Sequence, residues 1–177
     1  CADDLTKATI ICRKQMDDIV QYLREFVPGF EDCFIVSSAS LIGIRETRHF
    51  KGQYTITEQD IVEAKVFDDY VVKDAFINFD VHNITGSGLD KTGVQKHFTQ
   101  KSGYTIPYRC LLPEVKENLL LCGRNISGTH IAHSNFRAMP ICVGTGEAAG
   151  VAAAIAVKTG KKLCELDAAD IRKELNI

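Results

Sequence analysis

Two pairs of polar side chains stand at spacings that suit chemistry. Asp80 and His82 are two residues apart in a predicted strand, so their side chains share one face. A carboxylate beside an imidazole can orient the ring and raise its pKa for acid–base catalysis, although a structural polar pair at the end of a strand is the more common meaning of this spacing. His130 and His133 are three residues apart, as on one helical turn, in a polar segment. No acid or thiol accompanies them at ligand spacing, so we predict no metal site.

Two arginines are candidates for binding an anionic substrate group. Arg137 lies three residues before Pro140, near the expected start of a helix. Its guanidinium could hold a carboxylate through two hydrogen bonds, but a surface or capping arginine fits the same position. Arg109 interrupts an otherwise apolar segment, and a buried charge needs a partner or a ligand.

Glycines near the C-terminus allow two interpretations. The segment Gly144–Ala149 fits the dinucleotide-binding pattern G-x-G-x-x-G/A. However, Pro140 favours the first turn of a helix, so we expect the helix to begin there and the glycines to lie inside it as a packing surface. The free amides of Ile141, Cys142 and Val143 would then attract negative charge from a ligand. A second glycine-rich stretch, residues 86–93, lacks the strand and helix that a nucleotide loop requires.

Helical periodicity and capping residues predict the helices that position these groups. Apolar residues recur at helical spacing over residues 5–27, before Pro28 and Gly29. Thr57 begins a capping box with Asp60, which predicts a short helix through about residue 67. The helix that starts at Pro140 ends near Gly160, and Asp167 caps a last helix through about residue 175.

Strands are predicted from apolar and alternating runs. We expect strands at residues 33–36 and 75–82, and a bent strand or hairpin at residues 49–56 around Gly52. Residues 118–122 are nearly all apolar and predict a strand buried on both faces. A polar connection at residues 126–135 would follow it, placing both candidate histidines in a loop.

Composition excludes several classes of protein. The chain has 177 residues, 21 Lys and Arg against 23 Asp and Glu, and 45% hydrophobic residues, which suits a folded core rather than disorder. It lacks the basic surplus of a nucleic-acid-binding protein. The longest apolar run, residues 148–157, is about half of what a bilayer crossing needs. Seven cysteines without a C-x-x-C pair indicate free thiols in a reducing cytoplasm.

Several segments together resemble one family. These are Gly43–Tyr54, with Arg45-Glu46-Thr47-Arg48 inside it, Ile106–Pro113, Asn118–Arg124, His130–Met139 and Gly144–Gly150. In order and spacing they are similar to the C-terminal part of FAD-dependent oxidoreductases of the fumarate-reductase-like kind. The resemblance covers roughly residues 5–175.

The resemblance implies a flavin site split along a longer chain. In such proteins an N-terminal G-x-G-x-x-G unit binds the ADP part of FAD, and the chain returns later to complete the flavin pocket. The implied cofactor-binding residues here are Gly123, Arg124, Met139, Pro140, Ile141 and Cys142. Arg124 departs from the acidic residue found in much of the wider superfamily. Arg137 and His82 are the implied catalytic residues, and Arg109, His130 and His133 would contact a small-molecule substrate.

We therefore expect an α+β protein with a substrate-domain lobe and the C-terminal portion of a split Rossmann-like FAD-binding domain. Residues 1–108 would form the first part, residues 109–160 the returning strand and helix, and residues 161–177 a terminal helix. Because Cys1 replaces an initiating Met and the dinucleotide unit is missing, we expect a fragment of an oxidoreductase that is inactive alone. Its exposed strand would be covered by a second copy, by repacking or by the missing half. The alternative is a stand-alone module that binds a small ligand or a partner without redox activity.

Overall fold

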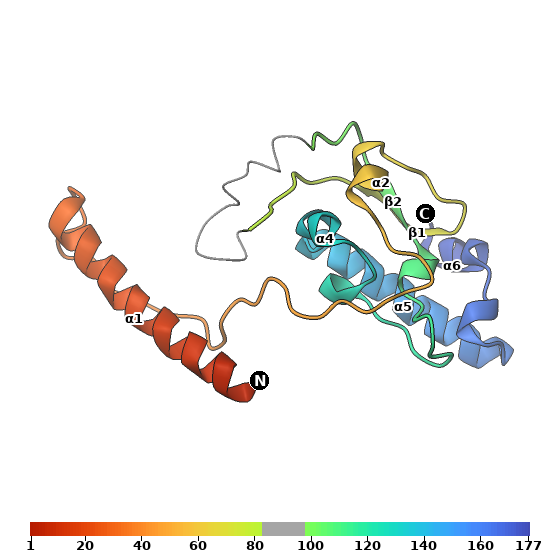
Figure 1. Ribbon diagram of the computed structural model, residues 1–177, viewed down its shortest axis with the longest axis horizontal. Helices are drawn as coiled ribbons and strands as arrows, with labels where there is room; N and C mark the ends of the chain where they lie inside the picture. Colours follow the sequence, from red (N-terminus) through yellow and green to blue (C-terminus); the bar gives the residue numbers. More distant parts are fainter. Residues whose placement is uncertain (83–97) are drawn as a thin grey trace. The chain divides into compact units, whose positions relative to one another are not determined.

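The computed structural model describes residues 1–82 and 98–177, which form two compact units, Cys1–Ile44 and Arg45–Ile177 (Figure 1). The glycine-rich stretch at 86–93 lies outside the described residues. Five α-helices and a two-stranded antiparallel sheet make up the regular structure of the described part, in addition to short 3-10 turns. The expected α+β class is therefore observed. An antiparallel pair does not form the parallel layer of a Rossmann-like domain.

The first unit consists of helix α1 (Ala2–Phe26) and an irregular return segment. The long N-terminal helix is confirmed, and Arg13 fastens the return segment to it through Ser38 and the carbonyl of Ala39. No residue of α1 is buried within the described structure. The strand predicted at residues 33–36 is wrong, because this stretch is irregular and has no strand to pair with among the described residues.

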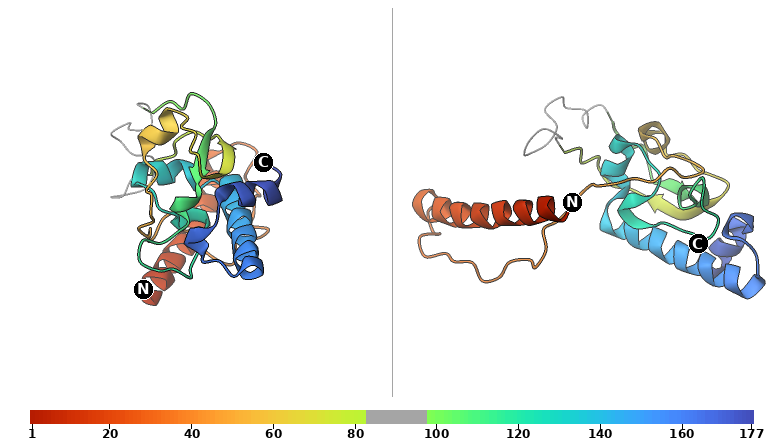
Figure 2. Two further views of the ribbon diagram at one scale, coloured as in Figure 1. Left: turned by 90° about the vertical axis from the view of Figure 1, so that its right-hand side faces the viewer. Right: turned by 60° about the horizontal axis from the view of Figure 1, so that its bottom comes forward.

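In the second unit, helices pack on a small sheet. Strands β1 (Tyr70–Ala75) and β2 (Tyr104–Pro107) pair with Val72 opposite Ile106. Helices α5 (Met139–Thr159) and α6 (Ala168–Leu175) contact β1 and each other. The right-hand view of Figure 2 shows the whole of α5, with the two short strands beside part of it. The fully buried core includes Ile56, Ile61, Tyr104, Ile106, Leu111, Ile126, Phe136 and Ile171.

The predicted helix caps of this unit are confirmed. Thr57 caps α2 (Glu58–Val62) in a capping box with Asp60, although α2 ends earlier than expected. Asp167 accepts a hydrogen bond from the amide of Ala169 at the start of α6. Gly160 ends α5 with a φ of 68°, the left-handed conformation that favours glycine.

Three further predictions for this unit are wrong. Residues 118–122 form no strand, because they are mostly exposed and the described part of the chain offers no sheet neighbours on either side. The predicted strand at 75–82 lies instead at Tyr70–Ala75. Residues 49–56 contribute two isolated bridges, at Gly52 and Ile56, rather than a hairpin. A strand needs a partner, which sequence patterns alone do not reveal.

The segment after the last predicted strand also differs. The polar connection expected at 126–135 contains helix α4 (His130–Phe136), whose first turn is capped by Thr129. Both candidate histidines are therefore on a helix and not in a loop. The second unit also joins elements from both sides of residue 108, and the predicted division into domains stays a prediction.

Helix α5 has the length and the apolar composition of a membrane span, the one such helix found among the described residues. The expectation that no segment is long enough is therefore wrong. Its buried face, Ile141, Thr145, Ala148 and Ala152, packs inside the second unit. A core helix of a folded domain has the same composition.

Candidate functional site

A cavity of about 600 Å³ opens beside the N-terminus of α5. Its walls come from three stretches of chain: residues 45–48, the turn η2 (Gly123–Asn125) with Cys122 before it, and residues 137–142. Four arginines line it, namely Arg45, Arg48, Arg124 and Arg137. So many guanidinium groups around one space favour an anionic ligand.

Hydrogen bonds fix the turn η2 against α5. The amide of Gly123 donates to Oγ1 of Thr145 at 2.9 Å, and that hydroxyl donates to the carbonyl of Cys142 at 2.9 Å. Gly123 has a φ of 78°, and no described atom lies within 4 Å of the position that a Cβ would take. The predicted cofactor residues Gly123 and Arg124 are thus held at the first turns of α5, with open space in front of the glycine.

The N-terminus of α5 differs by one residue from the prediction. The helix begins at Met139 rather than Pro140, and the amide of Cys142 already donates to the carbonyl of Ala138 at 2.9 Å. The expected free amide of Cys142 is therefore wrong. Because proline has no amide, Met139 and Ile141 carry the first amides of the helix.

The side chains of this turn point in different directions. Met139 and Cys142 line the cavity, and Met139 is 82% exposed. Ile141 is buried in the core, so its side chain serves packing and only its backbone could meet a ligand. Pro140 is exposed and is not among the residues that line the cavity.

The two predicted catalytic residues meet at Asp80. Nη2 of Arg137 donates to the carbonyl of Asp80 at 2.7 Å and to its Oδ2 at 3.1 Å. Nε2 of His82 donates to the same Oδ2 at 3.0 Å. The side chain of Arg137 is only 10% exposed, yet it also borders the cavity. Asp80 therefore orients both a guanidinium and an imidazole.

Arg109 forms an ion pair with another residue of the chain. Its Nε donates to Oδ2 of Asp69 at 2.9 Å and its Nη2 to Oδ1 at 3.1 Å, while the guanidinium lies over the ring of Tyr54. It is 47% exposed and does not belong to the described lining of the cavity. Arg109 therefore joins η1 (Tyr108–Cys110) to Asp69, the residue before β1, and the geometry gives no support to the predicted substrate contact.

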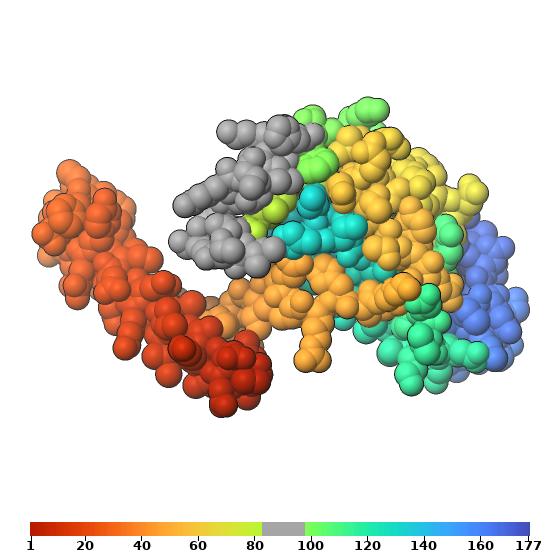
Figure 3. All heavy atoms as spheres, viewed as in Figure 1, coloured from red at the N-terminus to blue at the C-terminus, as the bar shows by residue number. Residues whose placement is uncertain are grey.

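The predicted substrate histidines gather around an acid that sequence spacing missed. Nδ1 of His130 lies 2.8 Å from Oε2 of Glu46, and Nδ1 of His133 lies 3.8 Å from it. His49 joins them, with Nε2 3.0 Å from Oε1 of Glu46. The reason given for expecting no metal site, the lack of an acidic partner, is therefore wrong. The space-filling view shows residues 45–56 lying against α4 (Figure 3).

Burial and charge shift the pKa values in this cluster. Burial would raise the pKa of Glu46, but the hydrogen bond from His130 and the nearby imidazoles lower it below its ordinary value. Burial lowers the pKa of His133 to about 4, a shift that Glu46 opposes and that His49 and Arg137 reinforce. At neutral pH His133 is therefore an uncharged imidazole beside a carboxylate.

The segment Arg45–His49 contributes to the site in a way that residue spacing did not predict. Arg45 and Arg48 flank Glu46 in the sequence, a spacing that fits a simple surface ion network among the three. Instead Glu46 pairs with histidines, and the two arginines border the cavity. The motif Arg45-Glu46-Thr47-Arg48 was the available signal, because it belongs to the family resemblance.

Comparison with known proteins agrees with this arrangement. The model of the family described as FAD dependent oxidoreductase matches residues 1–175. No curated protein and no solved structure matched the chain. A match over nearly the whole chain shows that this protein belongs to the FAD dependent oxidoreductases, a family whose cofactor is FAD.

Proposed function

We propose that the chain is the C-terminal part of a fumarate-reductase-like flavoprotein, in which it completes the site of hydride transfer between a small organic substrate and FAD. One observation carries the proposal. The cavity at the start of α5 gathers five residues predicted from the sequence for this site: Gly123, Arg124, Arg137, Met139 and Cys142. They come from two segments, residues 123–124 and 137–142, and sequence spacing does not by itself bring these segments together.

The residues around the cavity fit FAD. The first amides of the 21-residue helix α5 suit the flavin oxygens that gain negative charge on reduction. Gly123 leaves room for close backbone approach, and Arg124 supplies positive charge for the ribityl or pyrophosphate part. Met139 and Cys142 offer apolar and polarisable contact for the ring. Arg124 thus provides charge where many relatives carry an acid.

The chain's own residues would bind the substrate and move a proton. When bound, FAD supplies the hydride donor or acceptor. Arg137 holds a negatively charged group of the substrate through the guanidinium nitrogens that Asp80 does not occupy. His82, fixed by the same carboxylate through Nε2, donates or accepts a proton at Nδ1. Orientation by a shared acid is what both roles require.

The same proposal implies that the dinucleotide-binding portion of the flavin domain comes from another segment of a longer protein. Gly144 and Gly146 lie inside α5 and form no phosphate-binding turn, so another segment of a longer protein would supply the G-x-G-x-x-G unit. That segment would add the parallel layer of the split Rossmann-like domain to the substrate-domain lobe. The chain alone would then be inactive and would associate with the missing half or with a second copy. We propose a cytoplasmic location for the parent protein, because the seven cysteines of this chain are free thiols.

The test compares this chain with the protein extended by its upstream reading frame. The extended protein should purify with a visible flavin band, and the chain alone should bind added FAD far more weakly, because the pyrophosphate anchor is absent. FAD fluorescence quenching measures both. A flavin-free extended protein, with no quenching by added FAD, would overturn the proposal in favour of a stand-alone binding module.

A further inference from the structure

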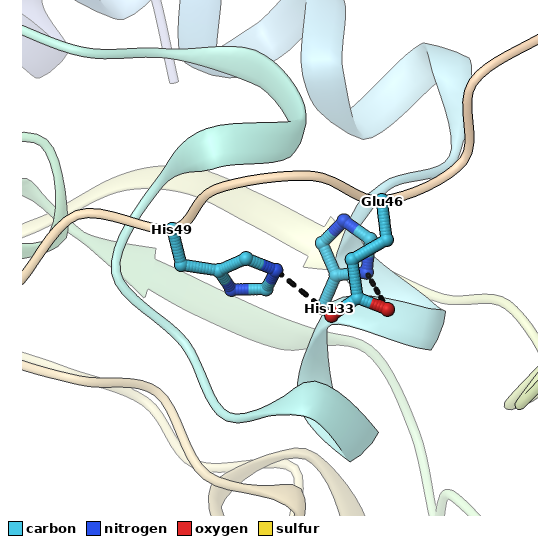
Figure 4. A group of neighbouring side chains, drawn as sticks. All are labelled: Glu46, His49 and His133. Carbon is cyan, nitrogen blue, oxygen red and sulfur yellow. Dashed lines mark ion pairs between the residues drawn. The ribbon is translucent and has the colours of Figure 1, made fainter. Parts of the chain in front are cut away.

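The cluster of Glu46 with His49 and His133 has the donor atoms of a metal site (Figure 4). One carboxylate oxygen and one nitrogen from each ring all lie within 4.8 Å of one another. Glu46 and His49 come from the irregular segment before Gly52, and His133 comes from α4. Neither the family match nor the proposed redox chemistry assigns a role to this group.

The hydrogen bond on the far side of His49 fixes its tautomer. Nδ1 of His49 lies 3.2 Å from the carbonyl of Gly128. A carbonyl can only accept, so Nδ1 carries the hydrogen and the neutral ring presents the lone pair of Nε2. Oε1 of Glu46 lies 3.0 Å from Nε2 but outside the direction of a hydrogen bond with it. A lone pair and a carboxylate oxygen this close repel each other unless a proton on Nε2 or a metal ion lies beside them. A backbone carbonyl bound to the other nitrogen is the usual support of a metal-ligating histidine.

His133 supplies a second unpartnered nitrogen. Its side chain is 1% exposed, and its Nδ1 has no hydrogen-bond partner within the described part of the chain. The Nε2 of His49 is likewise buried without a hydrogen bond there, because its contact with Glu46 lacks hydrogen-bond geometry. Buried polar atoms normally find partners, and orphaned ones call for an explanation such as an ion.

The spacing agrees with a small divalent cation. Zinc–nitrogen bonds of about 2.0–2.1 Å in tetrahedral geometry place neighbouring ligand atoms roughly 3.4 Å apart. The distance from Nε2 of His49 to Oε1 of Glu46 is 3.0 Å, and the distance from Nδ1 of His133 to the other oxygen, Oε2, is 3.8 Å, so the two lie on either side of that value. His130 is not one of the three proposed ligands, but it supports the carboxylate of Glu46, because its Nδ1 lies within 2.9 Å of both oxygens. Calcium and magnesium prefer oxygen ligands, so two imidazoles favour zinc or a similar transition metal.

We propose that Glu46, His49 and His133 bind one divalent transition-metal cation of the zinc class. The cation would fasten the segment that carries Arg45 and Arg48 to helix α4, and thereby fix one wall of the arginine-lined cavity. Its fourth position stays open to water. This inference does not depend on the presence of FAD.

The test uses the whole chain, freed of metal by a chelator and titrated with Co²⁺ and then Zn²⁺. We expect one equivalent to bind, with visible Co²⁺ bands and without the intense near-ultraviolet band of thiolate ligation, although the chain has seven free cysteines. Glu46→Gln and His49→Gln should each weaken binding by about 100-fold or more. His130→Ala should weaken it by about 10–100-fold, as expected for a supporting residue.

His82→Gln is the matched control, because His82 also pairs with a carboxylate but lies outside the cluster. It should bind Co²⁺ like the unaltered chain. Circular dichroism checks that the variants fold, and X-ray absorption of the zinc form should show two imidazole ligands. No binding by the folded chain, thiolate bands, or full binding by Glu46→Gln would each overturn the proposal.

Discussion

The guanidinium of Arg137 donates to both the backbone carbonyl and the carboxylate of Asp80, at 2.7 Å and 3.1 Å. The two residues are 57 positions apart in the chain. The same carboxylate holds His82. A guanidinium anchored in this way has few accessible orientations, so little conformational entropy is lost when it binds an anion.

Replacing Arg137 by Ala should slow reduction of the bound flavin by about 10²–10³-fold, the usual effect of removing one positioned charge-stabilising donor. The visible flavin band should remain, because other residues contact the cofactor. Stopped-flow absorbance in the flavin-loaded extended protein measures this, using the organic substrate that reduces the unaltered protein. Arg109→Ala is the matched control. Its bound flavin should be reduced at the normal rate, because Arg109 pairs with Asp69 and not with the substrate. Equal losses in both variants would contradict the role of Arg137.

Asp60 should contribute to stability in a pH-dependent manner. It is 6% exposed and accepts hydrogen bonds from Tyr54, Thr57 and Lys65, the last at 2.7 Å. Burial would raise its pKa, but these bonds lower it below the ordinary value of 3.8. A lowered pKa means that the stabilisation is present above pH 3.8 and is lost as the pH falls through the folded-state value.

Asp60→Asn should therefore lower the free energy of unfolding by about 1–3 kcal/mol at pH 7. The difference from the unaltered chain should shrink as the pH falls below 4, roughly the ordinary range of aspartate. Urea denaturation followed by circular dichroism measures both. Asp68→Asn, at an exposed position nearby, should change little. A difference that stays constant down to the lowest pH at which the chain folds would show that the charge of Asp60 is not responsible.

Tyr104 and Asn135 form a buried hydrogen bond that should stabilise the second unit. The hydroxyl of Tyr104 donates to Oδ1 of Asn135 at 2.9 Å, and both residues are 0% exposed. Tyr104→Phe would leave that oxygen without its donor and should cost about 1–3 kcal/mol. Tyr70→Phe keeps the ring that packs on Arg172 and should stay within about 0.5 kcal/mol. Similar losses in the two variants, measured by urea denaturation, would show that this hydrogen bond is unimportant.

Alanine substitutions at two glycines should have opposite effects on the stability of the chain. A Cβ on Gly128 would lie 2.6 Å from Cζ of Phe136, which is fully buried and cannot move away. Gly128→Ala should therefore cost about 1–3 kcal/mol. No described atom lies within 4 Å of a Cβ on Gly146, inside α5, so Gly146→Ala should stabilise the chain by about 0.5–1 kcal/mol. Thermal unfolding gives the sign of each change, and destabilisation by Gly146→Ala would contradict the open space at that position.

The sequence predicted those parts of the fold that depend on local interactions. The capping box of Thr57, the cap at Asp167 and the glycine at the end of α5 act within one turn, so their residue types are sufficient evidence. Thr129 carried the same signal for α4, because its hydroxyl accepts from the amide of Ala132, but the surrounding polar residues favoured a loop. The strand at residues 118–122 failed because an apolar run specifies burial and not a pairing partner.

The sequence by itself determined the family motifs, the long helix behind the cavity and the residues Gly123, Arg124 and Arg137 as members of one site. Only the tertiary structure showed that Glu46 lies among the histidines and that Arg109 is paired with Asp69. Glu46 and His130 are 84 residues apart, and a contact over such a separation is decided by how the segments pack. Local spacing carries no record of that packing, which is why the acidic partner of the histidines could not be read from the chain.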